Sequence, residues 1–305
     1  MMSHPRSPIS GLVAGLALIA SSACARNNAE QDVHADHTVA PAAATTAAAT
    51  GDANLPAGAN DVAARLARSP RHGEWVMIRT GPSDSVKAWV VYPERSAKAP
   101  VVLVVHEIFG LSTWVRGVAD QLAADGFIAI APDLLTTKAT PAPGSDTLTQ
   151  TVATAAIRTL QGADVHRQLA AVGQYGMSLP AAERRYGIVG FCWGGSTSFM
   201  HAVMSPAGLG ASVVYYGTSP ADSLLPRVKV PVLGLYGGDD ARVNATIAPA
   251  VESMRSLGKS YEPHTFAGAG HGFLRQQDGK DGANLAAARQ AWPLTIAFFR
   301  TNLGR

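Results

Sequence analysis

One cysteine of the chain stands where a reactive side chain could be held on a sharp turn. Residues 187–200 read GIVGFCWGGSTSFM, so that an apolar run leads into Gly190, Cys192 and Gly194 and a helical pattern follows at once. This Gly-x-Cys-x-Gly spacing is typical of a strand-to-helix turn that presents a nucleophile, with a thiol in place of the usual serine hydroxyl. The start of the following helix favours a thiolate. The alternative is that Cys192 is simply a small buried hydrophobic residue.

A thiol nucleophile needs a base and a group that orients the base, and both residue types lie downstream. His271 sits between glycines in GAGHGF, where a side chain has little packing to do. Asp239 and Asp240 directly follow the apolar run VPVLGLYGG, where an acid loop belongs. The order nucleophile, acid, histidine is that of α/β-hydrolases. Either aspartate fits this order, and each could also be a solvated loop acid.

Glu107 follows His106, which comes directly after the β-branched run PVVLVV at residues 100–105. Such a run predicts a central strand that is covered on both faces. A carboxylate at the carboxyl end of a parallel strand points to the crevice in which these sheets bind ligands. The alternative is an ordinary charge at the end of a strand.

The elements that must hold these residues alternate between strand-like and helical patterns. EWVMIRT and SVKAWVVYP, separated by a Gly-Pro-Ser-Asp turn, predict an antiparallel opening hairpin. Further strand-like runs are PVVLVV, FIAIA, YGIVGF, ASVVYYG, VPVLGLYGG and YEPHTF, and helical patterns lie between them and at the end of the chain. Alternating strands and helices predict an α/β fold with a mostly parallel central sheet and helices on both faces.

Together these stretches resemble the dienelactone hydrolase family of α/β-hydrolases. The matching segments are VVHEIFGL, GFIAIAPDLL, GFCWGG, YYG, YGGDDARV and GAGHGFLR. The resemblance implies the α/β-hydrolase fold and a Cys192–His271–Asp240 triad, in which the second aspartate of GGDD is the acid. It also implies hydrolysis of a carboxylic ester, lactone or thioester through an acyl-cysteine intermediate.

The same resemblance assigns roles to four further residues. Glu107 is expected to pair with the resting thiol and to help deprotonate it when substrate arrives. The oxyanion hole is expected to consist of the backbone N–H groups of Ile108 and Trp193. Arg275, just beyond the histidine, matches an arginine that holds the substrate's carboxylate. A second arginine of the family, after APDL, is missing here, and nearby Lys138 lacks the bidentate fork of arginine.

The beginning of the chain has the pattern of a targeting segment. Arg6 gives a positive start, residues 9–20 are a short apolar run, and residues 21–25 read SSACA. Two processing routes fit this pattern: ordinary signal-peptide cleavage, or cleavage and lipidation at Cys24 as in bacterial lipoproteins. We favour the lipoprotein and expect an exported bacterial protein that is periplasmic or anchored to a membrane.

Three parts of the chain follow from these observations. Residues 1–25 are the expected signal, and residues 26–71 are an Ala/Thr-rich stretch that we predict to be a disordered tether. Residues 72–303 are the expected hydrolase domain. Because Cys24 is used in export, Cys192 is left as a lone thiol.

Charge and the absence of certain motifs argue against nucleic acid, metals and cofactors as partners. A hydrophobic content of 47% allows a sizeable core, and a net charge of +3 without a basic run argues against nucleic acid. The sequence has no His-x-x-x-His, no cysteine pair and no Gly-x-Gly-x-x-Gly loop, so we expect no metal and no cofactor. We expect a monomer that acts on a small-molecule ester or lactone. The rival functions are a non-catalytic binding lipoprotein on the same fold and a thiol redox protein.

Overall fold

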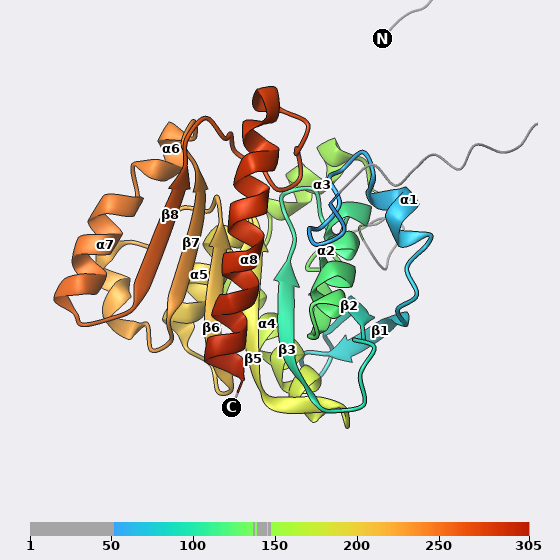
Figure 1. Ribbon diagram of the computed structural model, residues 1–305. Coiled ribbons are helices and arrows are strands. Elements are labelled where there is room, and N and C mark those ends of the chain that lie inside the picture. Colours follow the sequence, from blue (N-terminus) through green and yellow to red (C-terminus); the bar gives the residue numbers. More distant parts are fainter. Residues whose placement is uncertain (1–51, 137, 139–144, 146–147, 305) are drawn as a thin grey trace, which may run out of the picture. The chain divides into compact units, whose positions relative to one another are not determined.

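An eight-stranded sheet organises the described part of the chain, which in this computed structural model is residues 52–304 without 137, 139–144 and 146–147 (Figure 1). The strand order is β1-β2-β4-β3-β5-β6-β7-β8. β1 and β2 form the predicted antiparallel hairpin, β2 also pairs antiparallel with β4, and all other pairs are parallel. The strands are β1 Gly73–Arg79, β2 Ser85–Val91, β3 Ala99–Val105, β4 Ile128–Pro132, β5 Ala182–Phe191, β6 Leu209–Tyr215, β7 Val232–Gly237 and β8 Tyr261–Phe266.

Helices cover both faces of this sheet, as the sequence predicts (Figure 1). α1, α2 and α8 pack on one face, and α4, α5 and α7 pack on the other. The helices are α1 Val62–Leu66, α2 Thr113–Ala124, α3 Gln150–Ile157, α4 Gly162–Ser178, α5 Trp193–Met204, α6 Ala241–Asn244, α7 Ile247–Ser256 and α8 Ala283–Leu303, with 3-10 turns η1 Asp222–Arg227 and η2 Lys280–Gly282.

The order of the central strands predicts where a ligand would bind. All seven residues of β3 are buried, because helices cover both of its faces. The chain leaves β3 for β4 on one side and then returns to β5 on the other side. The carboxyl ends of β3 and β5 therefore border a topological switch point, where open α/β sheets bind ligands.

The folded unit begins earlier than the sequence predicts. Leu55 and Val62 are each only 3% exposed and pack in the same core as α2 and α8. The Arg65 guanidinium donates to the carbonyl of Ala53 at 2.6 Å and to Gln121 of α2 at 2.5 Å. The predicted tether is therefore wrong over residues 52–71, because two apolar anchors and one arginine fix an otherwise small-residue segment. The predicted signal and the remaining tether lie outside the described residues.

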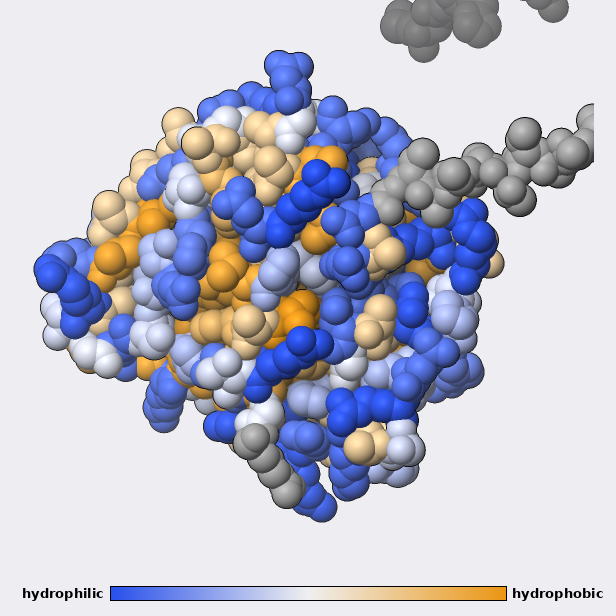
Figure 2. Space-filling view, in the orientation of Figure 1, coloured by the Kyte–Doolittle hydropathy of each residue, from blue (hydrophilic) through white to orange (hydrophobic). Residues whose placement is uncertain are grey.

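The surface of the described residues offers no membrane-spanning element. No helix there is both long enough and apolar enough to cross a bilayer. On the α8 face, Figure 2 shows apolar patches interspersed with hydrophilic residues. The large apolar side chains that are most exposed come from four separate parts of the chain: Met77, Val152, Met204 and Leu257.

Candidate active site

Cys192 lies on the turn that joins β5 to α5. Its φ of 57° and ψ of −116° put a residue with a side chain in a sparsely populated backbone region. Its N–H donates to the carbonyl of Tyr215, at the end of neighbouring β6, over 3.0 Å. The helix begins at the next residue, Trp193. The turn thus holds a half-buried thiol at the carboxyl edge of the sheet, as the Gly-x-Cys-x-Gly spacing predicts.

The glycines around this turn are required by close backbone contacts. A Cβ on Gly190 would collide with the carbonyl oxygen of Gly194. A Cβ on Gly194 would in turn collide with two carbonyl oxygens at the end of β3, those of Val105 and His106. β5, α5 and the end of β3 can approach one another only because these positions lack side chains. The segment after β3 is thereby brought against the start of α5.

The thiol of Cys192 is held in its protonated form at rest. Burial raises its pKa above the ordinary value, and the negative charge of Glu107 raises the pKa further. The N–H of Trp193, at the start of α5, lowers the pKa but does not outweigh these two effects. The stabilisation of a thiolate expected from the helix N-terminus is therefore smaller than the cost of burying the charge.

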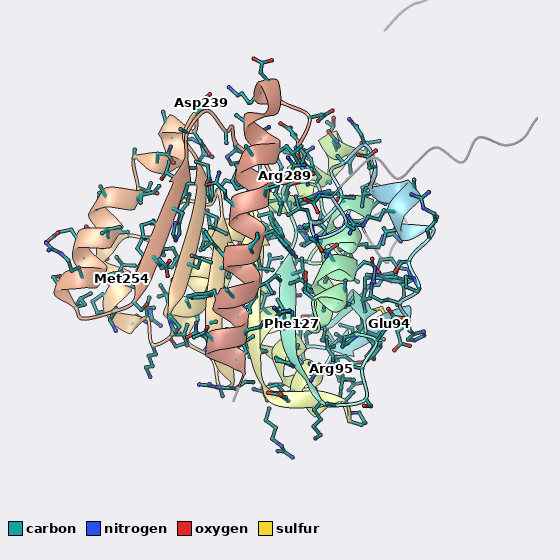
Figure 3. The ribbon with its side chains drawn as sticks, viewed as in Figure 1. Glu94, Arg95, Phe127, Asp239, Met254 and Arg289 are labelled. Carbon is teal, nitrogen blue, oxygen red and sulfur yellow. The ribbon has the colours of Figure 1, made fainter. Side chains whose placement is uncertain are left out.

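His271 and Asp240 form a close pair, whereas the neighbouring aspartate does not join it. Nδ1 of His271 lies 2.5 Å from Oδ2 of Asp240, which is buried and caps the start of α6. Because Nδ1 donates to this carboxylate, Nε2 is left to accept a proton. Asp239 instead forms a 3.0 Å salt bridge with Lys280, and both side chains are about half exposed. Figure 3 shows Asp239 at the end of the sheet to which β7 and β8 point.

Tyr216 lies beside His271 and directly follows the residue that bonds to the backbone of Cys192. It follows β6 directly, beside the residue whose carbonyl accepts from Cys192, and its ring lies 5.2 Å from that of His271 between centroids. Its hydroxyl is buried and has no hydrogen-bond partner among the described residues. Burial raises the pKa of this hydroxyl well above its ordinary value, and the charge of Glu107 adds to the rise. The Tyr216 ring therefore lies beside the imidazole of His271, and the charges of Glu107 and Cys192 both raise the pKa of its hydroxyl.

Glu107 and Arg275 form a second close pair. Oε2 of Glu107 lies 2.7 Å from Nε of Arg275, and the two side chains are 3% and 20% exposed. Burial raises the pKa of Glu107 to about 7, although the charge of Arg275 opposes the rise. Glu107 therefore pairs with Arg275, and its charge raises the pKa of Cys192. A direct pairing of Glu107 with the resting thiol stays a prediction.

Arg275 also faces a hollow in the described part of the molecule. Its guanidinium lies 5.1 Å from the centroid of the Phe109 ring. A cavity of about 270 Å³ opens beside these two residues and is further lined by Ala59, Val62 and Gln150. Residues before β1, where the sequence predicts a tether, therefore contribute to the wall of this cavity.

The two expected oxyanion-hole donors come from segments that are in contact. Trp193 is the first residue of α5, and its N–H acts on the sulfur of Cys192. Ile108 follows Glu107 in the turn after β3, the segment against which Gly194 packs. A substrate oxygen next to the thiol could accept from both N–H groups, which is the arrangement that stabilises a tetrahedral oxyanion.

Sequence reasoning missed two residues of this site. Tyr216 was visible only as part of the YYG segment, and nothing in its spacing reports an unpaired hydroxyl. His106 has no glycines around it in the sequence and so gives no local signal. It is nevertheless fully buried, lies 2.8 Å from the carbonyl oxygen of Glu107 and stacks on the ring of Trp193. No group of histidine, cysteine and carboxylate side chains that could hold a metal occurs among the described residues.

The sequence pattern of the dienelactone hydrolase family matches residues 86–303, which include both charge pairs and the thiol turn. The chain belongs to the dienelactone hydrolase family. The family match ends at the last residue of α8, and it leaves out the segment before β2 that helps to line the cavity.

Individual relatives agree with this assignment. The "Putative carboxymethylenebutenolidase" of Methylorubrum extorquens is 32% identical over 229 residues, which cover 70% of this chain and 76% of that protein. The "Probable 2-oxo-3-(5-oxofuran-2-ylidene)propanoate lactonase" of a Bradyrhizobium species is 30% identical over 245 residues, 75% of this chain and 94% of that protein. A crystal structure of a "Putative Dienelactone Hydrolase" from Klebsiella pneumoniae has a TM-score of 0.66 at 26% identity and covers 75% of this chain and 98% of its own.

These likenesses confirm the family and the fold that the sequence predicts. The protein has the α/β-hydrolase fold with an eight-stranded, mostly parallel mixed sheet. It is a hydrolase of the dienelactone hydrolase and carboxymethylenebutenolidase kind.

Proposed function

We propose that this dienelactone hydrolase-like protein cleaves carboxylic esters, lactones or thioesters through an acyl-cysteine intermediate, and prefers substrates that carry a free carboxylate. The observation that carries the proposal is the position of Cys192 on a nucleophile turn beside two charge pairs, His271–Asp240 and Arg275–Glu107. The first pair is suited to moving a proton. The second pair offers a cation to an anionic substrate.

Substrate binding would begin at Arg275. A guanidinium can hold a carboxylate by two parallel hydrogen bonds, but in the resting site its Nε is occupied by Glu107. A substrate carboxylate that binds Arg275 therefore competes with Glu107. The cavity beside Arg275 has room for the carboxylate end of a small substrate, whereas Cys192 and His271 are not among its lining residues. The Bradyrhizobium relative is named for a lactone that bears a propanoate group.

Displacement of Glu107 would activate the thiol. Without its counter-ion, a carboxylate whose pKa is already raised to about 7 becomes a better base and can take the proton of Cys192. The thiolate then attacks the substrate carbonyl carbon and forms a tetrahedral intermediate. Its negative oxygen would accept hydrogen bonds from the N–H groups of Ile108 and Trp193.

His271 would complete both halves of the reaction. Nε2 of His271 takes over the proton that Cys192 gave to Glu107. As the intermediate collapses, the C–O or C–S bond breaks, and His271 gives this proton to the departing oxygen or sulfur. The acyl group remains on Cys192 as a thioester. Neutral His271 then takes a proton from water, which attacks the thioester and releases the acid and the thiol. Asp240 keeps the imidazole oriented and stabilises its charged form.

We also propose that the enzyme is exported and works as a monomer, with Cys24 as a lipid anchor. The support is the charged start, the short apolar run and the SSACA segment near the N-terminus. Expression in a bacterium followed by fractionation tests this proposal. Full-length protein in the cytoplasmic fraction would contradict it, and a soluble periplasmic form cleaved after residue 25 would exclude the anchor.

A substrate panel tests the proposed activity. Purified protein is offered p-nitrophenyl acetate and a five-membered unsaturated lactone, the latter both with a free carboxylate and as its methyl ester. We expect turnover of all three, the highest kcat/KM for the carboxylate, and no turnover by Cys192→Ala. A panel without hydrolysis would favour a binding protein on the same fold, and activity that survives in Cys192→Ala would exclude the acyl-cysteine route.

A further inference from the structure

The peptide group between Glu107 and Ile108 is held by an imidazole that the proposed reaction does not use. Nδ1 of His106 lies 2.8 Å from the carbonyl oxygen of Glu107. Nε2 of the same ring lies 3.2 Å from the backbone nitrogen of Leu134, just after β4. His106 is fully buried, so neither ring nitrogen can exchange its partner for bulk water.

These two contacts define the protonation state of the ring. The backbone N–H of Leu134 can only donate, so Nε2 of His106 must carry a lone pair. The ring proton is therefore on Nδ1, which donates to the carbonyl of Glu107. Burial lowers the pKa of His106, although the charge of Asp133 opposes this effect. The imidazole stays neutral and keeps one donor and one acceptor.

Holding this carbonyl also fixes the direction of the next N–H. A peptide group is planar and trans, so its C=O and N–H point in opposite directions. The carbonyl of Glu107 points towards His106, and the N–H of Ile108 must point away from it. The His106 ring also stacks on the indole of Trp193, with centroids 5.6 Å apart and planes inclined by 21°. One imidazole therefore bonds to the peptide group that carries the N–H of Ile108 and stacks on Trp193, whose N–H is the other proposed oxyanion donor.

We propose that His106 is a positioning residue for the oxyanion hole. It orients the Glu107–Ile108 peptide through Nδ1, is itself held in place by the N–H of Leu134, and supports the ring of Trp193. This inference rests on the proposed function, because an oxyanion hole matters only if a carbonyl group is attacked. Only a neutral histidine presents a donor and an acceptor on opposite sides of one rigid ring at these two positions.

Two substitutions separate the two ends of the ring. In His106→Asn the side-chain amide lies near the former Nδ1 and can still donate to the carbonyl of Glu107, but it cannot reach Leu134. In His106→Gln the longer amide reaches the former Nε2 and can accept from Leu134, but it has no donor for the carbonyl. A positioning role therefore predicts the larger loss of kcat in His106→Gln. A role in stability alone predicts the larger loss of kcat in His106→Asn.

The experiment measures three quantities for the wild type and both variants: kcat for p-nitrophenyl acetate, the rate of Cys192 alkylation by iodoacetamide, and the melting temperature. We expect His106→Gln to lose about 10- to 100-fold in kcat, somewhat less than removal of an oxyanion donor costs. Its alkylation rate should stay the same, because alkylation develops no oxyanion. We expect His106→Asn to keep most of its kcat and to melt at a lower temperature than His106→Gln.

Unchanged kcat in His106→Gln, or losses of kcat that follow the melting temperature in both variants, would overturn the positioning role. A parallel fall of the alkylation rate and kcat in His106→Gln would also overturn it, because the thiol itself would then have been disturbed. Full wild-type activity in Cys192→Ala would instead contradict the proposed function. Failure of the positioning role is therefore seen in the His106 variants, and failure of the proposed function is seen in Cys192→Ala.

Discussion

The carboxylate of Glu107 and the guanidinium of Arg275 meet at 2.7 Å in the interior of the candidate site, where neither is well hydrated. The attraction between the two charges offsets only part of the cost of removing Glu107 from water. The pKa of Glu107 therefore remains raised, at about 7. Glu107 therefore changes its charge in the neutral pH range. The pair is suited to exchange of one carboxylate for another.

Replacing Glu107 by glutamine should make the free thiol more reactive. Because the charge of Glu107 raises the pKa of Cys192, its removal lowers that pKa and increases the fraction of thiolate at neutral pH. Burial is the larger cause of the raised pKa and is retained, so the pKa should move only part of the way down. The measurement is the rate of iodoacetamide inactivation against pH, with Asp239→Asn as control. The glutamine variant should also turn over more slowly, and overlapping inactivation profiles would rule out this effect of Glu107.

Arg275 should act on substrates according to their charge. Replacing it by alanine removes a charge-assisted contact with a substrate carboxylate, worth about 1.5–3 kcal/mol or roughly 10- to 100-fold in kcat/KM. Neutral p-nitrophenyl esters should not show this loss, because they offer Arg275 no carboxylate. Arg275→Lys should recover only part of the loss, because lysine lacks the bidentate fork. Equal losses on charged and neutral esters would indicate a structural role.

The two neighbouring aspartates should differ sharply. Asp240→Asn removes the carboxylate at 2.5 Å from Nδ1 of His271 and should lower kcat by about 10²–10⁴-fold. Asp239→Asn breaks only a half-exposed salt bridge with Lys280 and should leave kcat within about twofold. Steady-state kinetics on one ester decides the matter, and a larger loss from Asp239→Asn would mean that the wrong acid has been assigned.

The sequence alone predicts the scaffold better than the contacts within the site. The nucleophile turn, the central strand and the histidine loop follow from local patterns, since glycine spacing and β-branched runs act over a few residues. The choice of Asp240 over Asp239 came only from the family resemblance. Glu107 and Arg275 are far apart in the sequence, and only the folded sheet brings these two side chains together.

The prediction of a tether failed over residues 52–71 for the same reason, since contacts between distant residues are not visible in local composition. The segment before β1 has few apolar residues, and its composition favours disorder. The structure nevertheless buries Leu55 and Val62, because Arg65 ties that segment to α2. The role inferred for His106 likewise depends on the N–H of Leu134, which only the pairing of β3 with β4 brings near.

Tyr215 and Tyr216 offer a matched pair for separating stability from function. The hydroxyl of Tyr215 is bonded to Thr295 at 2.7 Å, so Tyr215→Phe should lower the free energy of unfolding by about 1 kcal/mol. The hydroxyl of Tyr216 has no partner among the described residues, so Tyr216→Phe should cost no stability. It should nevertheless reduce kcat/KM by up to about tenfold, as expected for a hydroxyl that bonds only to substrate. Urea unfolding and ester kinetics give the two readouts, and a loss of stability in Tyr216→Phe would show that its hydroxyl does have a partner within the protein.

Trapping the acyl-enzyme shows which residue is the nucleophile. The His271→Ala variant is mixed with p-nitrophenyl acetate, quenched in acid and analysed by intact mass spectrometry and peptide mapping. Because His271 is the base for the water step, the acyl-enzyme should accumulate in this variant, with one acetyl group per chain on the peptide that contains Cys192. The double variant His271→Ala, Cys192→Ala should remain unmodified. An acetyl group on any other residue, or equal labelling of the double variant, would contradict a Cys192 nucleophile.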